Sequence, residues 1–526
     1  MDSKKRYGGR RWRTFRQGRS LRRQRHVEET PVDSKAAAAP GHLSLRTKSL
    51  YGFGSISFGV HVYVLSLLLF FYNQIIGLPA QMVSLALAAT LVLDALWDPI
   101  LGQFSDRLRT PWGRRHPLMY LSAIPVAVTM FLLWRPPASF SMVEKGVWLF
   151  VLVTAARLVI SLYEVPSQAL APELAPDYHQ RTGLMAWRWV FFTFGGVIVT
   201  LLGSFIFFRA TKQYPQGQLN PAGWGPFTLT ATLVMFGSIV ISALGTHDRI
   251  KTLHRPPVRK LNFTQTVADI ARTLKNWNLA VALSASVIGG IGYGMYLGLA
   301  FYIDTFVWGL PAKSVGMLQL AALAALLPGA WLAGAVSRRF GKKKSCIAFF
   351  LIGLTLLQGP ILLQVMGLFP AHGSAAYMPL LIVLRFVWSI FNNSAYIVVT
   401  SMIADITEDA QVKSGNRAEG LLMATNSFVV KLTTGFANLL PGLILAYVAF
   451  PAKASGTVDP AIVAHFVWVY LPATTSVSLI SILIWLFYRI DQKTHEKNLA
   501  TVREAEALAA RAAEAAGEAA PLRAAE

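Results

Sequence analysis

Apolar stretches alternate with short polar segments from Ser49 to near the end of the chain. A helix needs about 20 predominantly apolar residues to cross a hydrocarbon core of about 30 Å. On this criterion the pattern predicts about twelve membrane-spanning helices in two sets of six. The first set lies near 49–78, 82–104, 117–134, 146–174, 182–208 and 227–246, and the second near 278–309, 314–337, 344–369, 376–404, 418–450 and 463–489.

The longer polar segments separate the predicted domains. These are a basic arm (1–46), a first six-helix half (47–246), a linker (247–277), a second half (278–490) and an Ala/Glu-rich tail (491–526). The arm lacks the apolar core of a signal peptide and is too charged to fold alone, so we expect it to be disordered. Three readings of its basic run stay open: a surface for anionic lipid headgroups, a determinant of topology only, and a misassigned start of the chain.

Composition excludes a water-soluble globule. The 526 residues are 54% hydrophobic and 14% charged, with a mean hydropathy of +0.46. The net charge of +23 is concentrated in the arm and in short loops, which the positive-inside rule explains without a nucleic-acid partner. The single cysteine, Cys346, excludes an intrachain disulfide framework.

Loop charge predicts the orientation of the chain. Three loops carry RLRTPWGRR, HDRIKTLHRPPVRK and SRRFGKKK, whereas GLPAQ and FPAHGSAA between the other helix ends are nearly uncharged. The basic loops and both termini are therefore expected in the cytoplasm. The Arg- and Ala-rich composition is typical of a high-GC bacterium, so we expect a multi-pass protein of the inner (plasma) membrane.

The two halves share a motif. Helices two and eight both end in a glycine followed by a basic turn, at Gly102 and Gly334. Such parallel repeats are typical of major facilitator transporters, with a substrate site near the midplane. We therefore predict an all-α integral membrane fold of twelve helices in two halves. The charges of the two turns are a predicted cytoplasmic gate, or alternatively topology signals alone: Asp106, Arg114 and Arg115, and Arg338, Lys342 and Lys343.

Two carboxylates interrupt the second apolar segment. Asp94 and Asp98 are one helical turn apart, so their Cβ atoms lie on one face about 5–6 Å apart. Each charge costs about 2.5–3.5 kcal/mol at the centre of a membrane helix on insertion scales. Retention of both therefore predicts a functional role.

With these residues in view, the chain resembles the glycoside-pentoside-hexuronide:cation symporters, the melibiose permease-like family of the major facilitator superfamily. The resemblance runs from about Tyr51 to Ile490. Its most specific parts are YGFG at 51–54, DALWDPILGQFSDR at 94–107, WGRRHP at 112–117, YEVPSQAL at 163–170, MIADITE at 402–408 and SFVVK at 427–431.

The resemblance implies a set of site residues. Asp94, Asp98, Ser161 and Glu164 match the cation site, and Glu164, Gln168, Arg188, Tyr396 and Lys431 match substrate or coupling positions. The chain also departs from the family pattern: helix one has no acid around Phe58, Gln168 replaces a tryptophan, and Trp97 replaces an asparagine. The first two changes leave the identity of the sugar open. The third favours protons over sodium, because indole supplies no oxygen ligand.

The acids also suggest how coupling works. Three acids in one dry pocket repel each other, so at least one is protonated or shares a cation when buried. Lys431 lies well inside helix eleven and needs a counter-charge, unless it snorkels to the interface. We expect Lys431 to pair with the acids until a proton or sodium ion neutralises them, which would bias the two transport states.

Other polar or small residues lie within the spans. Arg157 on helix four either compensates a nearby charge such as Glu164 or takes a direct substrate role, and both readings stay open. Asp304 on helix seven and Arg385 on helix ten are expected to pair with each other or line the cavity. The glycines of IGGIGYGMYLG at 288–298 follow no strand and precede no P-loop lysine, so we interpret them as sites of close helix approach or bending.

The predicted function is a cation-coupled secondary symporter of a small polar solute, by resemblance a sugar or glycoside, that works by alternating access. The alternatives are an amphipathic cargo such as a lysolipid on the same fold, and less favoured, a channel or a structural membrane protein. An enzyme is not expected, because neither HExxH nor a nucleophile–base motif is present. We expect no cofactor, no metal beyond a possible sodium ion, no nucleic acid and no obligate protein partner; the partners are the solute and membrane lipid.

Overall fold

The computed structural model describes residues 43–175, 178–252, 276–414, 419–454 and 458–490, together with Thr494 and Thr501. All of these belong to one compact unit, Leu43–Glu526. The predicted arm lies outside the described residues as far as His42, as do most of the linker and nearly all of the predicted tail.

The first half contains six long helical segments. Its first crossing is broken into three helices and a terminal π-helix, and its fifth also ends in a π-helix. The elements are α1 (Leu45–Phe53), α2 (Ser55–Ser66), α3 (Leu68–Phe70), η1 (Phe71–Ile76), α4 (Ala80–Arg107), α5 (His116–Leu133), α6 (Met142–Leu174), α7 (Tyr178–Leu202), η2 (Gly203–Phe207), the 3₁₀ turn η3 (Gly217–Leu219), α8 (Pro221–Gly245) and the 3₁₀ segment η4 (His247–Thr252).

The second half repeats this arrangement. Its elements are α10 (Trp277–Tyr302), the π-helix η5 (Ile303–Val307), α11 (Ala312–Ala324), α12 (Leu326–Phe340), α13 (Lys342–Val365), α14 (Tyr377–Ser414), α15 (Glu419–Tyr447) and α16 (Pro460–Trp485). Eleven segments of the described residues are long and apolar enough to span a membrane, and α15 supplies the twelfth long helix. The predicted twelve-helix fold is confirmed, with boundaries close to those expected from the apolar pattern.

Local sequence explains several helix boundaries. Ser141 and Glu144 form a capping box at the start of α6, and Pro221 and Pro460 occupy the first turns of α8 and α16. The first crossing of each half ends in a π-helix followed by a glycine with positive φ, Gly77 at 93° and Gly309 at 59°. Glycine adopts this backbone conformation without the steric cost of a Cβ atom.

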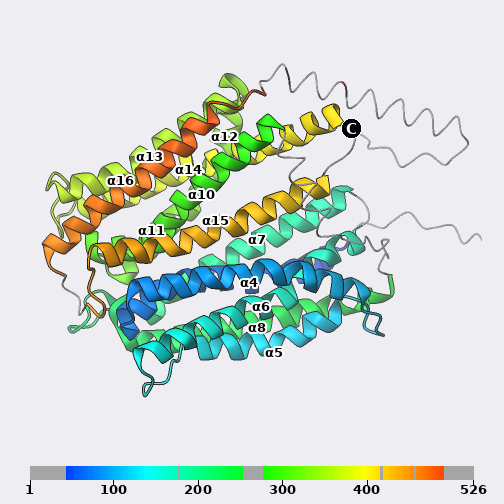
Figure 1. The fold of residues 1–526 in the computed structure, drawn as a ribbon, viewed down its shortest axis with the longest axis horizontal. Coiled ribbons are helices and arrows are strands. Elements are labelled where there is room, and N and C mark those ends of the chain that lie inside the picture. The colour runs from blue at the N-terminus through cyan, green and yellow to red at the C-terminus, as the bar shows by residue number, and fades with distance from the viewer. Residues whose placement is uncertain are drawn as a thin grey trace, which may run out of the picture. The chain divides into compact units, whose positions relative to one another are not determined.

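Small residues bring α10 against α15. Gly290, Gly294 and Gly298 occupy successive turns of one α10 face, opposite Thr433, Ala437 and Pro441 on α15. A Cβ atom at Gly294 would lie 2.0 Å from the Cβ atom of Ala437. This confirms the prediction that the glycine run permits close helix approach. Figure 1 shows α15 lying next to α4 of the first half, and the two helices are in contact along their length.

Hydrogen bonds join the two halves at the end of the bundle where η1 and η5 lie. Gln218 donates to Thr305 Oγ1 at 3.0 Å and to the carbonyl oxygen of Leu310 at 2.9 Å, while Tyr302 donates to Asn73 Oδ1 at 2.9 Å. We call these five residues the inter-half latch. The opposite end, which carries Asp106 and the basic turns, is called the basic end.

Candidate functional site

Three predicted site residues meet between α6 and α7. The Glu164 carboxylate is buried, and its Oε1 atom accepts hydrogen bonds from Arg188 Nη2 at 2.5 Å and from Gln168 Nε2 at 2.9 Å. Arg188 also donates to Ser167 Oγ at 2.7 Å. A buried ion pair is stable only when further hydrogen bonds satisfy its polar atoms, and these contacts supply them. The predicted cation ligand Glu164 is thus the direct partner of the predicted substrate residue Arg188.

The YGFG segment supports this pair. Tyr51 is fully buried, its hydroxyl group donates to the carbonyl oxygen of Ser167 at 2.9 Å, and the Arg188 guanidinium lies 5.5 Å from its ring centroid. The side chain of Arg188 is therefore held by α1 as well as by α6. Sequence reasoning quoted Tyr51 and Ser167 within motifs but gave them no role, since a motif does not show which helix its side chains face.

The second helix brings its carboxylates alongside α6. Trp97 Nε1 donates to the carbonyl oxygen of Leu158 at 3.1 Å, and α4 and α6 are in contact along much of their length. Asp94 interacts electrostatically with the buried Arg157 guanidinium of α6. The structure therefore favours the charge-compensation role among those considered for Arg157. The hydrogen bond to Leu158 makes Trp97 part of the contact between α4 and α6.

The remaining atoms of this cluster define what it can bind. Ser161 is buried on α6, one turn before Glu164. The Oε2 atom of Glu164 is buried and has no hydrogen-bond partner within the described residues. A buried carboxylate oxygen without a donor is a costly feature that a bound cation or solute hydroxyl group would relieve.

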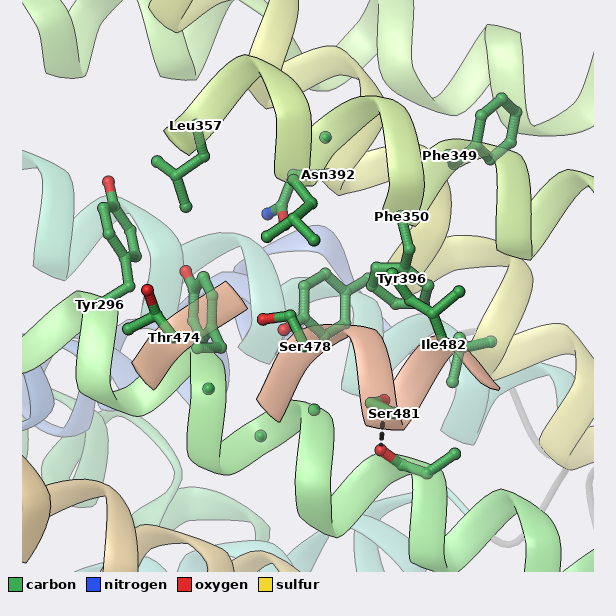
Figure 2. A pocket seen from close by; sticks show the side chains of 18 of the residues that line it. Tyr296, Phe349, Phe350, Leu357, Asn392, Tyr396, Thr474, Ser478, Ser481 and Ile482 are labelled. Carbon is green, nitrogen blue, oxygen red and sulfur yellow. Dashed lines mark hydrogen bonds between the residues drawn. The ribbon is translucent and has the colours of Figure 1, made fainter. Parts of the chain in front are cut away.

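Tyr396, a predicted residue of the second half, lines a cavity within that half. Tyr396 on α14 contacts Tyr293 on α10, with ring centroids 5.8 Å apart. Both line a cavity of about 150 Å³ among α10, α13, α14 and α16, together with Asn392 and Ser478 (Figure 2). Lys431 lies on α15, but its side chain is outside the described residues, so the structure leaves its predicted pairing untested.

The two arginines of the predicted gate in the first half converge on an acid that the sequence analysis did not select. Arg115 Nη2 lies 2.6 Å from Asp106 Oδ1, and Arg115 Nε lies 2.9 Å from Glu173 Oε1. Arg114 Nη2 reaches the same Glu173 oxygen at 3.0 Å. Glu173, only 3% exposed, is therefore the centre of this cluster.

The second half has a matching arrangement. Lys342 Nζ lies 2.7 Å from Asp405 Oδ1 on α14, and Lys343 donates to the carbonyl oxygen of Leu486 at 2.6 Å. Arg338 lies in the last turn of α12 beside Gly334 and makes no ion pair with the described residues. Glu173 and Asp405 lie on the fourth helix of their respective halves, so each basic turn pairs with an acid of its own half. The first of the two acids in MIADITE is Asp405, so this motif was a signal that could have identified it.

Comparisons with known proteins agree with this fold. The model of the family described as MFS/sugar transport protein matches residues 50–492. The isoprimeverose transporter of Lactiplantibacillus pentosus is 26% identical, over 83% of this chain and 86% of that protein. The inner membrane symporter YicJ of Escherichia coli (strain K12) is 25% identical, over 78% of this chain and 84% of that protein.

Solved structures show the same architecture. A bacterial homologue of the human lysosomal transporter Spinster, inward-facing and unoccupied, matches with a TM-score of 0.58 at 13% identity, over 86% of this chain and 97% of that one. The inward-open xylose transporter XylE of E. coli matches with a TM-score of 0.53 at 16% identity, over 87% and 98% of the two chains. These likenesses concern the fold, whereas the family model covers most of the sequence. The chain therefore belongs to the MFS/sugar transport protein family.

Proposed function

We propose that this member of the family is a cation-coupled symporter that moves a sugar or glycoside across the inner membrane by alternating access. Family membership and relatives named as an isoprimeverose transporter and an inner membrane symporter support this proposal. The observation that carries it is the buried Glu164–Arg188 pair, with a Glu164 oxygen left without a donor. A structural ion pair alone would not need a buried carboxylate oxygen that has no hydrogen-bond donor among the described residues.

The charge balance of the cluster gives a physical basis for coupling. Asp94, Asp98 and Glu164 carry three negative charges against the two positive charges of Arg157 and Arg188, which leaves one excess negative charge. One monovalent cation would neutralise it. In our proposal Lys431 competes with that cation, so that binding of a proton or sodium ion releases the lysine and shifts the balance between states.

Sugar recognition would draw on both halves. Arg188 and Gln168 offer hydrogen-bond donors beside Glu164, and Tyr396 offers an aromatic face from the second half. The first half would bind the hydroxyl groups of the solute, and the second half would contact its ring. Closure of the two halves would then be favourable only when the solute is bound. This differential binding is what alternating access requires.

The topology completes the proposal. Residues 47–246 and 278–490 act as the two moving halves, joined by 247–277, and both termini and the basic end face the cytoplasm. Asp106, Arg114 and Arg115 with Glu173, and Arg338, Lys342 and Lys343 with Asp405, form the two sides of a cytoplasmic gate. No cofactor or protein partner is required by this mechanism.

Transport into proteoliposomes tests the proposal. The panel is radiolabelled isoprimeverose, lactose, other glycosides and a lysophospholipid, each with an imposed proton or sodium gradient. We expect one gradient to drive accumulation of a sugar by the wild type, and Asp98→Asn to abolish it. Asp248→Asn is the matched control, because Asp248 is 68% exposed on η4, away from the cluster.

Three results would contradict the proposal. If neither gradient drives any sugar, the protein is not a sugar symporter; accumulation of the lysophospholipid alone would identify an amphipathic cargo instead. If Asp98→Asn accumulates sugar like the wild type, the carboxylates of α4 are structural. The gradient that succeeds identifies the coupling ion.

A further inference from the structure

A second carboxylate, remote from the α4–α6 cluster, lies inside the second half. Asp304 is in the π-helix η5, at the end of the first crossing of that half, and is 7% exposed. It makes no ion pair within 4.0 Å and accepts no side-chain hydrogen bond from the residues that the structure describes. A charged carboxylate in this setting carries a large desolvation cost that a partner would normally offset.

Arg385 on α14 acts on Asp304 electrostatically but forms no salt bridge with it within 4.0 Å. The two residues line the same cavity of about 50 Å³, whose remaining walls are largely apolar and come from α10, α11, α13 and α14. A cavity holds a water molecule when it is large enough and offers polar partners, and this one meets both conditions. Water between carboxylate and guanidinium would supply a proton donor and acceptor next to Asp304.

The Arg385 side chain is held by aromatic residues. Its Nη1 atom donates to the hydroxyl group of Tyr296, and its guanidinium lies 5.1 Å from the ring centroid of Trp388. Arg385 therefore keeps stabilising contacts when Asp304 is neutral. Of the two residues, Asp304 is therefore the one whose protonation state can change.

The titratable groups around Asp304 come from several elements. Besides Arg385 of α14, they are Tyr296 of α10 and Tyr63 of α2, and both tyrosines interact electrostatically with Asp304. Tyr470 of α16 interacts with Tyr296 and Arg385. The residues that α11 and α13 contribute to the cavity wall are Leu318, Leu356, Leu357, Pro360 and Ile361, which do not titrate. Tyr63 belongs to the first half, so the charge of Asp304 is felt across the boundary between the halves.

The position of Asp304 links it to the inter-half latch. Its neighbour Thr305 accepts from Gln218 of the first half, and Tyr302, two residues earlier, donates to Asn73 of the first half. The amide of Leu310, whose carbonyl is also a latch acceptor, donates to the backbone carbonyl of Asp304 at 2.9 Å. Separation of the halves at this end breaks the bonds of Thr305 and Tyr302 to the first half and opens the boundary beside Asp304 to water. π-helical turns of this kind are frequent at functional sites.

We propose that Asp304 is a proton-binding site of the transport cycle, separate from the α4–α6 cluster, whose protonation stabilises the closed inter-half latch. The carboxylate takes up a proton from water at the latch end before closure and becomes a neutral acid, so closure buries no unpaired charge. Loss of that proton makes the closed state costly and favours opening. The inference rests on the proposed alternating-access function and adds a second ionisable site to it.

A distance measurement tests the link without relying on transport. Spin labels at Lys212→Cys and Ser374→Cys, exposed positions of the two halves at the latch end, report separation of the halves in nanodiscs. The one native cysteine, Cys346, is fully buried and should stay unlabelled. We expect acidification to increase the closed population in the otherwise wild-type protein. In Asp304→Asn the closed population should be high and should respond to pH less than in the wild type, any remaining response coming from the α4–α6 cluster, whereas the Asp248→Asn control should respond like the wild type.

Each outcome is decisive. A pH response in Asp304→Asn equal to that of the wild type would overturn the proposal, and so would a wild type whose closed population does not change with pH. If Asp304→Asn fails to fold, Asp304→Glu keeps the titratable group and should shift the midpoint of the response; an unchanged midpoint would also overturn it.

Transport separates this inference from the proposed function. With a wild type that accumulates sugar, Asp304→Asn should lose gradient-driven accumulation but retain exchange of labelled for unlabelled sugar. Full accumulation by Asp304→Asn would refute the Asp304 proposal and leave the symporter assignment intact. A wild type that transports no sugar would refute the symporter assignment. The spin-label measurement would still decide whether protonation of Asp304 closes the latch.

Discussion

The inter-half latch allows a quantitative prediction about the balance of conformations. Gln218 is fully buried and donates two hydrogen bonds across the boundary, to Thr305 Oγ1 and to the Leu310 carbonyl oxygen. Gln218→Ala removes both and leaves two acceptors buried in the closed state. In the open state water can reach these acceptors, so the substitution should penalise the closed state more than the open one.

The size of the effect follows from the number of bonds. Two hydrogen bonds at about 0.5–1.5 kcal/mol each amount to about 1–3 kcal/mol. At about 1.4 kcal/mol per factor of ten, the ratio of open to closed molecules should rise about 5- to 140-fold. Spin labels at Lys212→Cys and Ser374→Cys would report this as growth of the longer distance at the expense of the shorter one.

A matched glutamine provides the control. Gln364 lies at the same end and donates to His372 within the second half, so Gln364→Ala removes a side-chain amide without touching the boundary. Its distance distribution should equal that of the wild type. If Gln218→Ala also leaves the distribution unchanged, or if both variants shift it equally, the hydrogen bonds of Gln218 do not hold the halves together and the reasoning fails.

Two further predictions concern stability. Gly294→Ala should lower the free energy of unfolding of the purified protein by about 1–3 kcal/mol, because the new Cβ atom would lie 2.0 Å from that of Ala437. Gly353→Ala on α13 is the control: its Cβ atom meets no atom within 4 Å, so its melting temperature should equal that of the wild type. Glu173→Gln should destabilise by about 3–5 kcal/mol, because it leaves Arg115 without its most buried counter-charge. A melting temperature for Glu173→Gln equal to that of the wild type would show that Asp106 alone satisfies Arg115.

The apolar pattern was sufficient to predict the twelve helices, because membrane-spanning length is a local property of the sequence. The resemblance brought Glu164, Gln168 and Arg188 into one site, and the structure places them in direct contact. What the sequence could not supply was the partner of each charge. Arg188 follows Glu164 by 24 residues and lies on the next helix, so only the packing of α6 on α7 shows that the two residues pair.

The π-helical ends of the crossings were likewise beyond sequence reasoning. Phe71–Ile76 and Ile303–Val307 each contain two polar residues among apolar ones, and nothing in their spacing distinguishes a π-helix from an α-helix. Their geometry is set by tertiary contacts such as the bond from Tyr302 to Asn73. Asp304 was recognised as an intramembrane charge, but its place within the latch segment depends on this same geometry.

The two halves are most alike at the contacts that hold each one together. In the first half a Cβ atom at Gly59 would meet the backbone oxygen of Phe192 on α7 at 2.0 Å, which matches the crossing of α10 with α15 at Gly294. The acids Glu173 and Asp405 neutralise the two basic turns in equivalent positions. Close packing and paired charges let each half move as one body, which is what rocking about a central site requires.

The halves differ where charge lies inside the membrane. The first half concentrates three carboxylates and two arginines between α4, α6 and α7, whereas the second half offers an aromatic cavity and the separated pair of Asp304 and Arg385. A repeat that had diverged only by drift would accumulate changes that cost little, and buried charges cost a great deal. The asymmetry matches the division of roles in the two proposals, which centre ion and solute binding on the first half and place a protonation-dependent closure of the latch in the second.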